Sequence, residues 1–504
     1  MKRIFFTIAW ALLYGIHLYA QPVLTPRNVA LGGGGSTYIT DYNANFYNPA
    51  NLLIQDRQRN IDFGLLITGT YFNAVQNFSD LEEQRANLED YITAFNPGSY
   101  SISPIERNAV VADNYIKDRT TSLHQTRLDL TLLGFKWRNN ERAYSFVIRN
   151  RISSSFEVGR GWYSAEQQDF GDGLRLDRTL THRYQSLYEI SFGYAESFRF
   201  FSDMSPRLDE FNFGIAPKLV LGGAYQNAKW TNSYFDNGNS QINAIQEFEY
   251  AASGNFGLAT KEYLETELAQ PALVNNITDE IFNLDGIGAG IDIGFTYLIT
   301  IGSDLSTINE NRQQTNKSLR LSFSITDIGF VHYNENGIQL NSRLDTTSIA
   351  NFPSNDNLAN DAFVGAPGQF LDFTDQYGIS NPFTGVDRND GAFSVLLPIA
   401  IHAGALFEFN RVKLMGDLSI GLTNNAFNST KLVASAGVEI RPLKFLPLRA
   451  GTQLATELPS YFSFGTAIET KLWDLSIATQ FVSKTFSDNP TLTGVTVAAL
   501  QFHF

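Results

Sequence analysis

The chain has 504 residues, a formal net charge of −14, 17% charged residues and no cysteine. The negative charge argues against a nucleic-acid partner, because phosphate contacts require a basic face. No disulfide can form, so the fold must depend on hydrogen bonding and burial alone.

Residues 1–20 have the order of a secretory signal peptide. Lys2 and Arg3 form a short basic region, an apolar stretch runs from Ile4 to Leu18, and the small Ala20 precedes the expected cleavage. The alternative is a membrane anchor, but the apolar stretch is short for one. We therefore predict export through a cleaved signal peptide.

Residues 21–58 lack the alternation of a strand and contain two motifs. Gly32, Gly33, Gly34 and Gly35 precede Ser36, and Asn48, Pro49 and Ala50 precede Asn51-Leu52. No Lys follows the glycines, so this is not a phosphate-binding loop. Glycine here is expected to let the backbone approach a wall closely or adopt positive φ, and Asn48-Pro49 is expected to start a turn.

From residue 59 onward, apolar and small or polar side chains alternate, as in Trp473 to Phe481. Such a period of two is typical of strands with one apolar face. After residue 20 no segment is apolar for long enough to form a membrane helix, so a membrane could be crossed only by a closed barrel. The alternating segments number fourteen: 59–73, 126–137, 142–152, 184–198, 210–223, 286–300, 317–331, 396–409, 411–421, 432–441, 447–457, 460–471, 473–482 and 493–504.

The apolar phase switches between Leu132 and Leu133. A β-bulge at this position would explain the switch.

The connections between these segments sort by length. The four longest, 74–125, 153–183, 224–285 and 332–395, all fall on one side of an up-and-down arrangement. Bacterial outer-membrane barrels have long external loops and short periplasmic turns, whereas a β-sandwich has no such parity. We therefore predict an all-β fold: a transmembrane antiparallel up-and-down barrel of about fourteen strands. Within one long loop, Tyr263–Leu273 and Ile277–Leu284 are predicted to be short helices.

The two N-terminal motifs resemble the opening of the FadL-like outer-membrane proteins. The matching positions are Ala30–Gly35 and Asn48–Leu52. This superfamily includes fatty-acid and hydrocarbon channels and the PorV-type proteins of Bacteroidetes type IX secretion. The resemblance implies fourteen strands and an N-terminal plug or hatch, here residues 21–58, inside a barrel formed by residues 59–504. The long insertions suggest an uncharacterised Bacteroidetes subgroup.

The sequence offers no constellation for catalysis. The histidines that follow the signal peptide are far apart and lack metal-ligand spacing, and no nucleophile-elbow motif is present. Asp387–Gly391 resembles part of a calcium loop but lacks its later ligands. We predict no catalytic residue, no metal site, no cofactor and no enzymatic activity.

Charged residues of both signs fall on the inward phase of the predicted strands. The favoured interpretation is a wall that packs against the plug through salt bridges, because a fourteen-stranded barrel is narrow. The alternative is a pathway for a polar solute. The predicted lumen-lining residues are Asp62, Arg149, Glu189, Lys218, Asp292, Arg320, Asp417, Glu439, Arg449 and Glu469.

Two functions remain open. The first is passive passage of a small hydrophobic ligand across the outer membrane, gated by movement of the hatch. The second is a structural or accessory subunit of a secretion or surface-assembly complex with protein partners. Outer-membrane lipid surrounds the protein in both. A strand bulge beside the hatch with apolar side chains behind it would favour the channel, and a closed wall with a salt-bridged interior would count against it.

Overall fold

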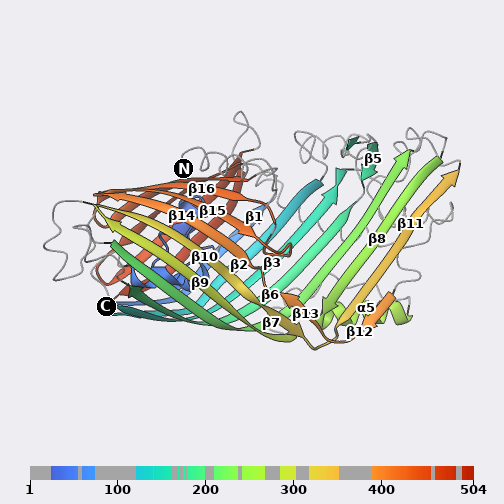
Figure 1. Cartoon of the computed structure of the whole chain (residues 1–504), viewed down its shortest axis with the longest axis horizontal. Helices are drawn as coiled ribbons and strands as arrows, with labels where there is room; N and C mark the ends of the chain where they lie inside the picture. Colours follow the sequence, from blue (N-terminus) through green and yellow to red (C-terminus); the bar gives the residue numbers. More distant parts are fainter. Residues whose placement is uncertain are drawn as a thin grey trace.

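The structure is a computed structural model that describes residues 24–54, 60–73, 121–139, 141–160, 168–169, 174–177, 179–198, 209–236, 241–266, 284–301, 317–350, 387–428, 430–455, 460–483 and 491–503. Its strands form one antiparallel sheet, most of which curves into a barrel (Figure 1). Fourteen strands close the ring in this order: β1 (Ile61–Asn73), β2 (Thr121–Arg138), β3 (Arg142–Gly159), β6 (Leu180–Phe198), β7 (Asp209–Asp236), β9 (Gly286–Thr300), β10 (Lys317–Tyr333), β14 (Ala400–Phe409), β15 (Val412–Gly421), β16 (Val433–Leu443), β17 (Leu446–Ala455), β18 (Ser460–Glu469), β19 (Trp473–Ser483) and β20 (Thr491–His503).

The ring closes between its first and last strands, with Asp62 opposite His503 and Tyr71 opposite Gly494. Every pairing around the ring is antiparallel, and closure removes the free strand edges that an open sheet would have. The predicted fourteen-stranded antiparallel barrel is confirmed, and each predicted segment overlaps one strand of the ring.

The wall has an apolar outer face and a polar inner face. Leu414 and Leu418 of β15 are about half exposed, at 51% and 49%, while Lys413 and Asp417 of the same strand are buried. The predicted bulge in β2 is also confirmed, because its register against β3 shifts between Thr131 and Leu133.

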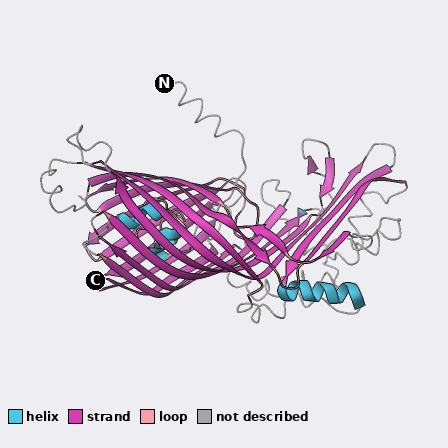
Figure 2. Ribbon diagram, turned by 60° about the horizontal axis from the view of Figure 1, so that its bottom comes forward, coloured by secondary structure: helices cyan, strands magenta, loops and turns pink. Residues whose placement is uncertain are grey.

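Several strands continue beyond the barrel as an open, projecting sheet (Figures 1 and 2). At Gly222 strand β7 leaves β9, and from Tyr225 onward it pairs with β8 (Gln241–Ser253). Strand β8 pairs with β11 (Ile338–Ala350), which pairs with β12 (Asp387–Asp390). Three short strands remain. Strand β4 (Gln168–Asp169) pairs with β5 (Leu174–Asp177), which pairs with β7, and β13 (Phe393–Leu396) pairs with β10.

The prediction of long loops is therefore wrong wherever these strands lie within the segments 153–183, 224–285 and 332–395. Only segments long enough to span a membrane were predicted to be strands. The change of the partner strand of β7 depends on tertiary packing, which local alternation does not reveal. Helix α5 (Gly254–Thr266) covers only the start of the predicted helix Tyr263–Leu273, and the rest of that helix falls outside the described residues. The predicted helix Ile277–Leu284 also falls outside them, except for Leu284, which has no regular structure. Connection 74–120 and the signal peptide also fall outside them. No described helix is long and apolar enough to cross a membrane.

The N-terminal segment, residues 24–54, lies inside the barrel (Figure 2). It contains α2 (Pro26–Ala30) and two 3-10 helices, η1 (Tyr42–Phe46) and η2 (Pro49–Leu53). Thr25, Asp41 and Asn48 each cap one of these helices through a side-chain oxygen. Pro49 occupies the first turn of η2, where its missing N–H costs nothing.

Candidate functional site

Ser36 joins the two N-terminal motifs. Its N–H donates to Asp417 Oδ1 at 3.0 Å, and its hydroxyl also bonds that carboxylate. Its carbonyl accepts from Asn48 at 3.0 Å and from Asn51 at 2.7 Å. Both asparagines also bond Thr296 of β9, at 2.9 and 2.7 Å. The glycine run and the Asn-Pro turn are thus held together and fixed to the wall.

The other polar groups of the N-terminal segment bond the wall in many directions. Side chains or backbone of the segment reach β2, β3, β6, β9, β10, β15, β18 and β20. An insert bonded on so many sides cannot leave the lumen without breaking most of these contacts at once.

Glycines in the wall make room for this segment. A Cβ at Gly214 would lie 2.2 Å from Ala50 N, and one at Gly294 would lie 1.9 Å from Asn48 Oδ1. Within the segment, Gly32 and Gly33 have φ values of +84° and +87°, which L-residues rarely adopt. Nine wall glycines meet the segment in this way: Gly64, Gly134, Gly193, Gly214, Gly294, Gly404, Gly437, Gly451 and Gly465.

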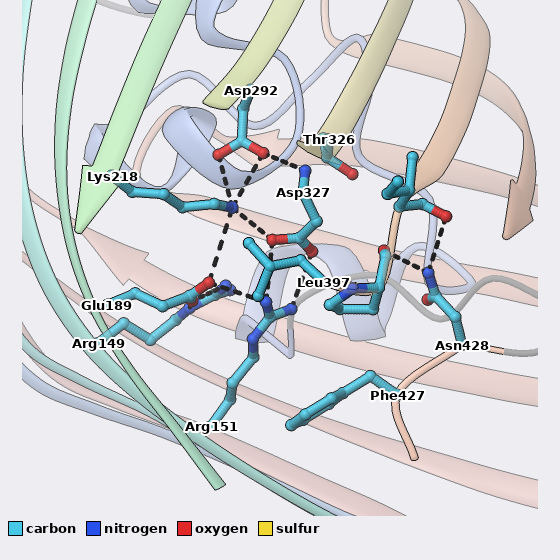
Figure 3. A network of polar contacts seen from close by, with 12 residues as sticks. Arg149, Arg151, Glu189, Lys218, Asp292, Thr326, Asp327, Leu397, Phe427 and Asn428 are labelled. Carbon is cyan, nitrogen blue, oxygen red and sulfur yellow. Dashed lines mark hydrogen bonds and ion pairs between the residues drawn. The ribbon is translucent and has the colours of Figure 1, made fainter. Parts of the chain in front are cut away.

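Beside this segment, six buried charged side chains meet (Figure 3). They come from five neighbouring strands: Arg149 and Arg151 of β3, Glu189 of β6, Lys218 of β7, Asp292 of β9 and Asp327 of β10. We refer to these six residues as the charged cluster. With three cations and three anions its formal charge sums to zero, which lowers the cost of burying it.

The charged cluster is connected throughout. Arg149 Nε donates to Glu189 Oε2 at 2.8 Å, and Arg151 reaches Glu189 at 2.8 Å and both oxygens of Asp327 at 2.9 and 3.0 Å. Lys218 Nζ lies 2.9 Å from Asp292 and also bonds Asp327. Buried ion pairs need good geometry and additional hydrogen bonds to offset desolvation, and among the described residues only Arg149 Nη1 and Arg151 Nε of these two guanidinium groups have no hydrogen-bond partner.

Asp327 enters the cluster through a bulge in β10. The register of β10 against β9 shifts between Ile325 and Ile328, and Asp327 has φ +59°. Simple alternation would point Asp327 outward, in phase with the exposed Leu321 and Phe323. The bulge turns its side chain into the lumen.

On its other side, β10 loses its regular pairing at the same level. The ladder with β14 ends at Thr326–Ala400, and the ladder with β13 begins at Phe330–Leu396. Between them Leu397 N–H donates to Gly329 O at 3.0 Å, and the Leu397 side chain is fully buried.

Leu397 belongs to an apolar cluster inside the lumen. Its members are Leu187, Val220, Tyr225, Val331, Tyr333, Phe393, Leu397, Ala426 and Phe427. A barrel lumen is usually polar, so this apolar cluster beside the charged cluster is a departure from the general pattern.

Two phenyl rings flank the charged cluster. Phe46 of the N-terminal segment lies 3.6 Å from the Arg149 guanidinium carbon, measured to the ring centroid. Phe427, from the turn between β15 and β16, lies 4.8 Å from that of Arg151. In each pair the guanidinium lies over the face of the ring, an arrangement that stabilises a buried cation.

Further ion pairs lie toward the short-turn end of the barrel. Glu439 and Glu469 are bridged by Arg449 at 2.7 and 2.6 Å, and Arg320 pairs with Glu408 at 3.0 Å. Where the ring closes, His503 Nδ1 lies 2.6 Å from Asp62 and its Nε2 lies 3.0 Å from Asp474.

Asp285 is a buried carboxylate outside the barrel wall, at the point where β7 changes partner. Its N–H donates to Gly222 O at 2.8 Å, and its carbonyl accepts from Asn334 N–H at 3.0 Å. Burial, with a smaller contribution from Glu335, raises the pKa of Asp285 to about 6.

All ten predicted lumen-lining residues are buried and lie on the inward phase. Four of them, Arg149, Glu189, Lys218 and Asp292, meet in the charged cluster, and Asp417 contacts the glycine motif. Sequence reasoning missed Arg151, Asp327, Arg127 and Asp129. Arg151 shares the phase of Arg149 and was detectable, whereas the placement of Asp327 depends on its bulge. Among the described residues, no group of three or more metal-ligating side chains is suited to holding a metal ion.

The closed ring, the apolar outer face and the polar interior define a transmembrane β-barrel of the outer-membrane type. The chain belongs to the family of unknown function DUF5723, whose model matches residues 60–479. The fourteen-stranded barrel that the resemblance to FadL-like proteins implied is observed; the Bacteroidetes subgroup stays a prediction.

Three solved structures illustrate what the chain is similar to. They are a TodX deltaS2S3 mutant, a monoaromatic hydrocarbon channel (12% identity, TM-score 0.42, covering 96% of this chain and 99% of that one); the Pseudomonas putida toluene transporter TodX (12%, 0.41, 97% and 99%); and the Ralstonia pickettii toluene transporter TbuX (13%, 0.38, 96% and 99%). No curated protein matches the sequence.

Proposed function

We propose that the protein resides in the outer membrane and lets small hydrophobic molecules cross it passively. The observation that carries this proposal is the apolar cluster inside the lumen, next to the interrupted pairing of β10. Hydrophobic molecules partition into buried apolar surroundings, whereas an ordinary polar lumen offers them none. No catalytic step is required.

The charged cluster limits which kinds of solute could pass through the lumen. Its six side chains are buried and mutually paired, so a polar solute would have to break these ion pairs to pass. A route that stays within the apolar cluster avoids this cost. The salt-bridged interior counts against transport through the lumen, as expected from the sequence. The bulge in β10 and the apolar cluster beside it are the features that favour a route for hydrophobic molecules.

A hatch formed by the N-terminal segment remains a prediction. Its bonds to eight strands and its fit against the wall glycines make displacement of the whole segment costly. Smaller rearrangements near the apolar cluster would break fewer contacts.

The test is uptake of the fluorescent probe 1-N-phenylnaphthylamine by Gram-negative cells with an intact lipopolysaccharide leaflet. We expect cells that express the protein to take up the probe faster than control cells. The control cells express, at the same level, an outer-membrane barrel whose lumen is closed, referred to below as the sealed barrel. Val331→Thr places a hydroxyl in the apolar cluster at nearly constant shape and should slow uptake. The matched control is Val147→Thr, which makes the same change beside the N-terminal segment. Uptake equal to that of the sealed barrel would refute the proposal.

The second candidate function is that of an accessory subunit of an outer-membrane complex. The observation that favours it is the projecting sheet of β7, β8, β11 and β12, which extends well past the barrel (Figure 2). Purification in mild detergent separates the two candidates. A stoichiometric protein partner without any probe uptake would favour the accessory role.

A further inference from the structure

The turn between β15 and β16 folds into the lumen and buries the side chain of Phe427 there. Phe427 and Ala426 are only 1% and 3% exposed. We refer to residues 422–428 as the inserted turn. It lies beside the charged cluster with the Phe427 ring turned toward Arg151 (Figure 3).

The ring of Phe427 occupies a site built by the wall. The guanidinium carbons of Arg127 and Arg151 lie 5.6 and 4.8 Å from its centroid. The N–H groups of these arginines bond Asp129 and Asp327, and both guanidinium groups lie over the face of the Phe427 ring. Around it lie Leu397 and other members of the apolar cluster.

Asn425 forms hydrogen bonds within the inserted turn. The Asn425 side chain accepts from the N–H groups of Phe427 and Asn428 at 2.9 and 2.8 Å, and Asn425 N–H donates to Asn428 O at 2.8 Å. Asn425 thus forms an Asx turn, which favours this local backbone shape.

In the part of the chain that the structure describes, the inserted turn also bonds the wall and residues 397–399. Leu422 N–H donates to Ile399 O at 2.8 Å, and the Thr423 hydroxyl donates to Leu397 O at 3.4 Å. Ala426 O accepts from Gln125 at 3.0 Å and from Ser153 at 2.5 Å. The Asn428 amide donates to Pro398 O and Ile399 O, where the strand pairing of β10 is interrupted. The N-terminal segment, by contrast, bonds eight strands. Of the two insertions, the turn is the one that can move as a small unit.

We propose that Phe427 occupies a binding site for a small aromatic molecule, and that such a molecule displaces the inserted turn when it binds. This inference rests on the proposed passage of hydrophobic molecules and names a class among them. The two guanidinium cations favour a π system over a saturated ring of equal size, because only the former has a negative face. The apolar cluster would accept either ring.

The absence of native cysteine allows a direct test. Ala426→Cys places one thiol in the inserted turn, where burial protects it from a maleimide reagent. In detergent-solubilised full-length protein, we expect toluene to speed alkylation by about fivefold or more, and methylcyclohexane to have much less effect. The matched control is Ala44→Cys in the N-terminal segment, which is equally buried and should stay unreactive with both compounds.

A second variant keeps the proposal falsifiable if Ala426→Cys fails to fold. Phe427→Ala vacates the site, so toluene should raise its apparent melting temperature more than that of the wild type, which must first lose its own ring contacts. Methylcyclohexane should stabilise this variant less than toluene does. Phe427→Leu, which refills the site in part, should respond less than Phe427→Ala.

Alkylation of Ala426→Cys that toluene leaves unchanged, or that both compounds accelerate equally, would overturn the inference. If probe uptake by cells persists in that case, the proposed function stands and only the assignment of the site fails. If uptake is absent but toluene exposes residue 426, the ring site stands and the transport proposal fails.

Discussion

Replacing Lys218 by Met tests whether neutrality of the charged cluster stabilises the barrel. Lys218 Nζ lies 2.9 Å from Asp292 and 3.6 Å from Glu189, and it also bonds Asp327. Its loss leaves two arginines against three carboxylates in a buried site. Breaking a buried pair in this way costs about 3–5 kcal/mol, whereas the similar volume of Met adds little.

A compensating change provides the sharper measurement. Adding Asp292→Asn to Lys218→Met restores two cations and two anions, and the amide oxygen can still accept from the Asp327 N–H. We expect the double variant to recover about 2 kcal/mol, a coupling typical of contacting buried charges.

The assay is urea unfolding in detergent micelles, followed by tryptophan fluorescence and by the electrophoretic shift of the folded barrel. Lys471→Met, in an exposed turn, is the control and should change stability by less than about 0.5 kcal/mol. A Lys218→Met variant as stable as the wild type, or additive costs in the double variant, would refute the electrostatic reasoning.

Three further variants test other parts of the structure. Gly214→Ala, whose Cβ would lie 2.2 Å from backbone of the N-terminal segment, should cost about 1–3 kcal/mol in urea unfolding, while Gly416→Ala, with nothing nearer than 3.8 Å, should be almost neutral; equal stability of the two would contradict the close fit. Asp285 has a raised native pKa of about 6, so its ionisation weakens the junction as pH rises from about 4 to 6. Hydrogen exchange of neighbouring amides, corrected for intrinsic rates, should be slower at low pH, and Asp285→Asn should abolish that difference. His503→Ala leaves two carboxylates at the ring closure without their shared partner and should cost about 2–3 kcal/mol in the same unfolding assay. The control is His332→Ala, which removes a half-buried histidine that hydrogen-bonds Ser394, and this change should cost much less. Similar losses in both variants would count against a role of His503 in closure.

Alternation along the chain was sufficient to predict the strands of the ring. Side chains of a strand point to opposite faces in turn, so a wall between lipid and a polar lumen imposes a period of two on every crossing. The segment 286–300, for example, coincides with β9. The same period placed Arg149, Glu189, Lys218 and Asp292 on the inner face, although it gave no indication that these four meet.

The extent of the strands past the membrane was not predictable in this way. Beyond the lipid, no apolar environment imposes alternation, and β7 changes its partner from β9 to β8 at a junction that only the packed chain defines. The stretches expected to be loops therefore contain β8, β11 and α5.

The sequence by itself thus determined the barrel, its inner and outer faces and the two motifs of the N-terminal segment, because these follow from local periodicity and backbone chemistry. Only the tertiary structure decided how they combine. The bulge at Asp327 reverses the direction that alternation assigns to its side chain. Phe427 reaches Arg127 and Arg151 across the lumen. Such contacts join residues hundreds of positions apart, and their geometry depends on closure of the whole ring.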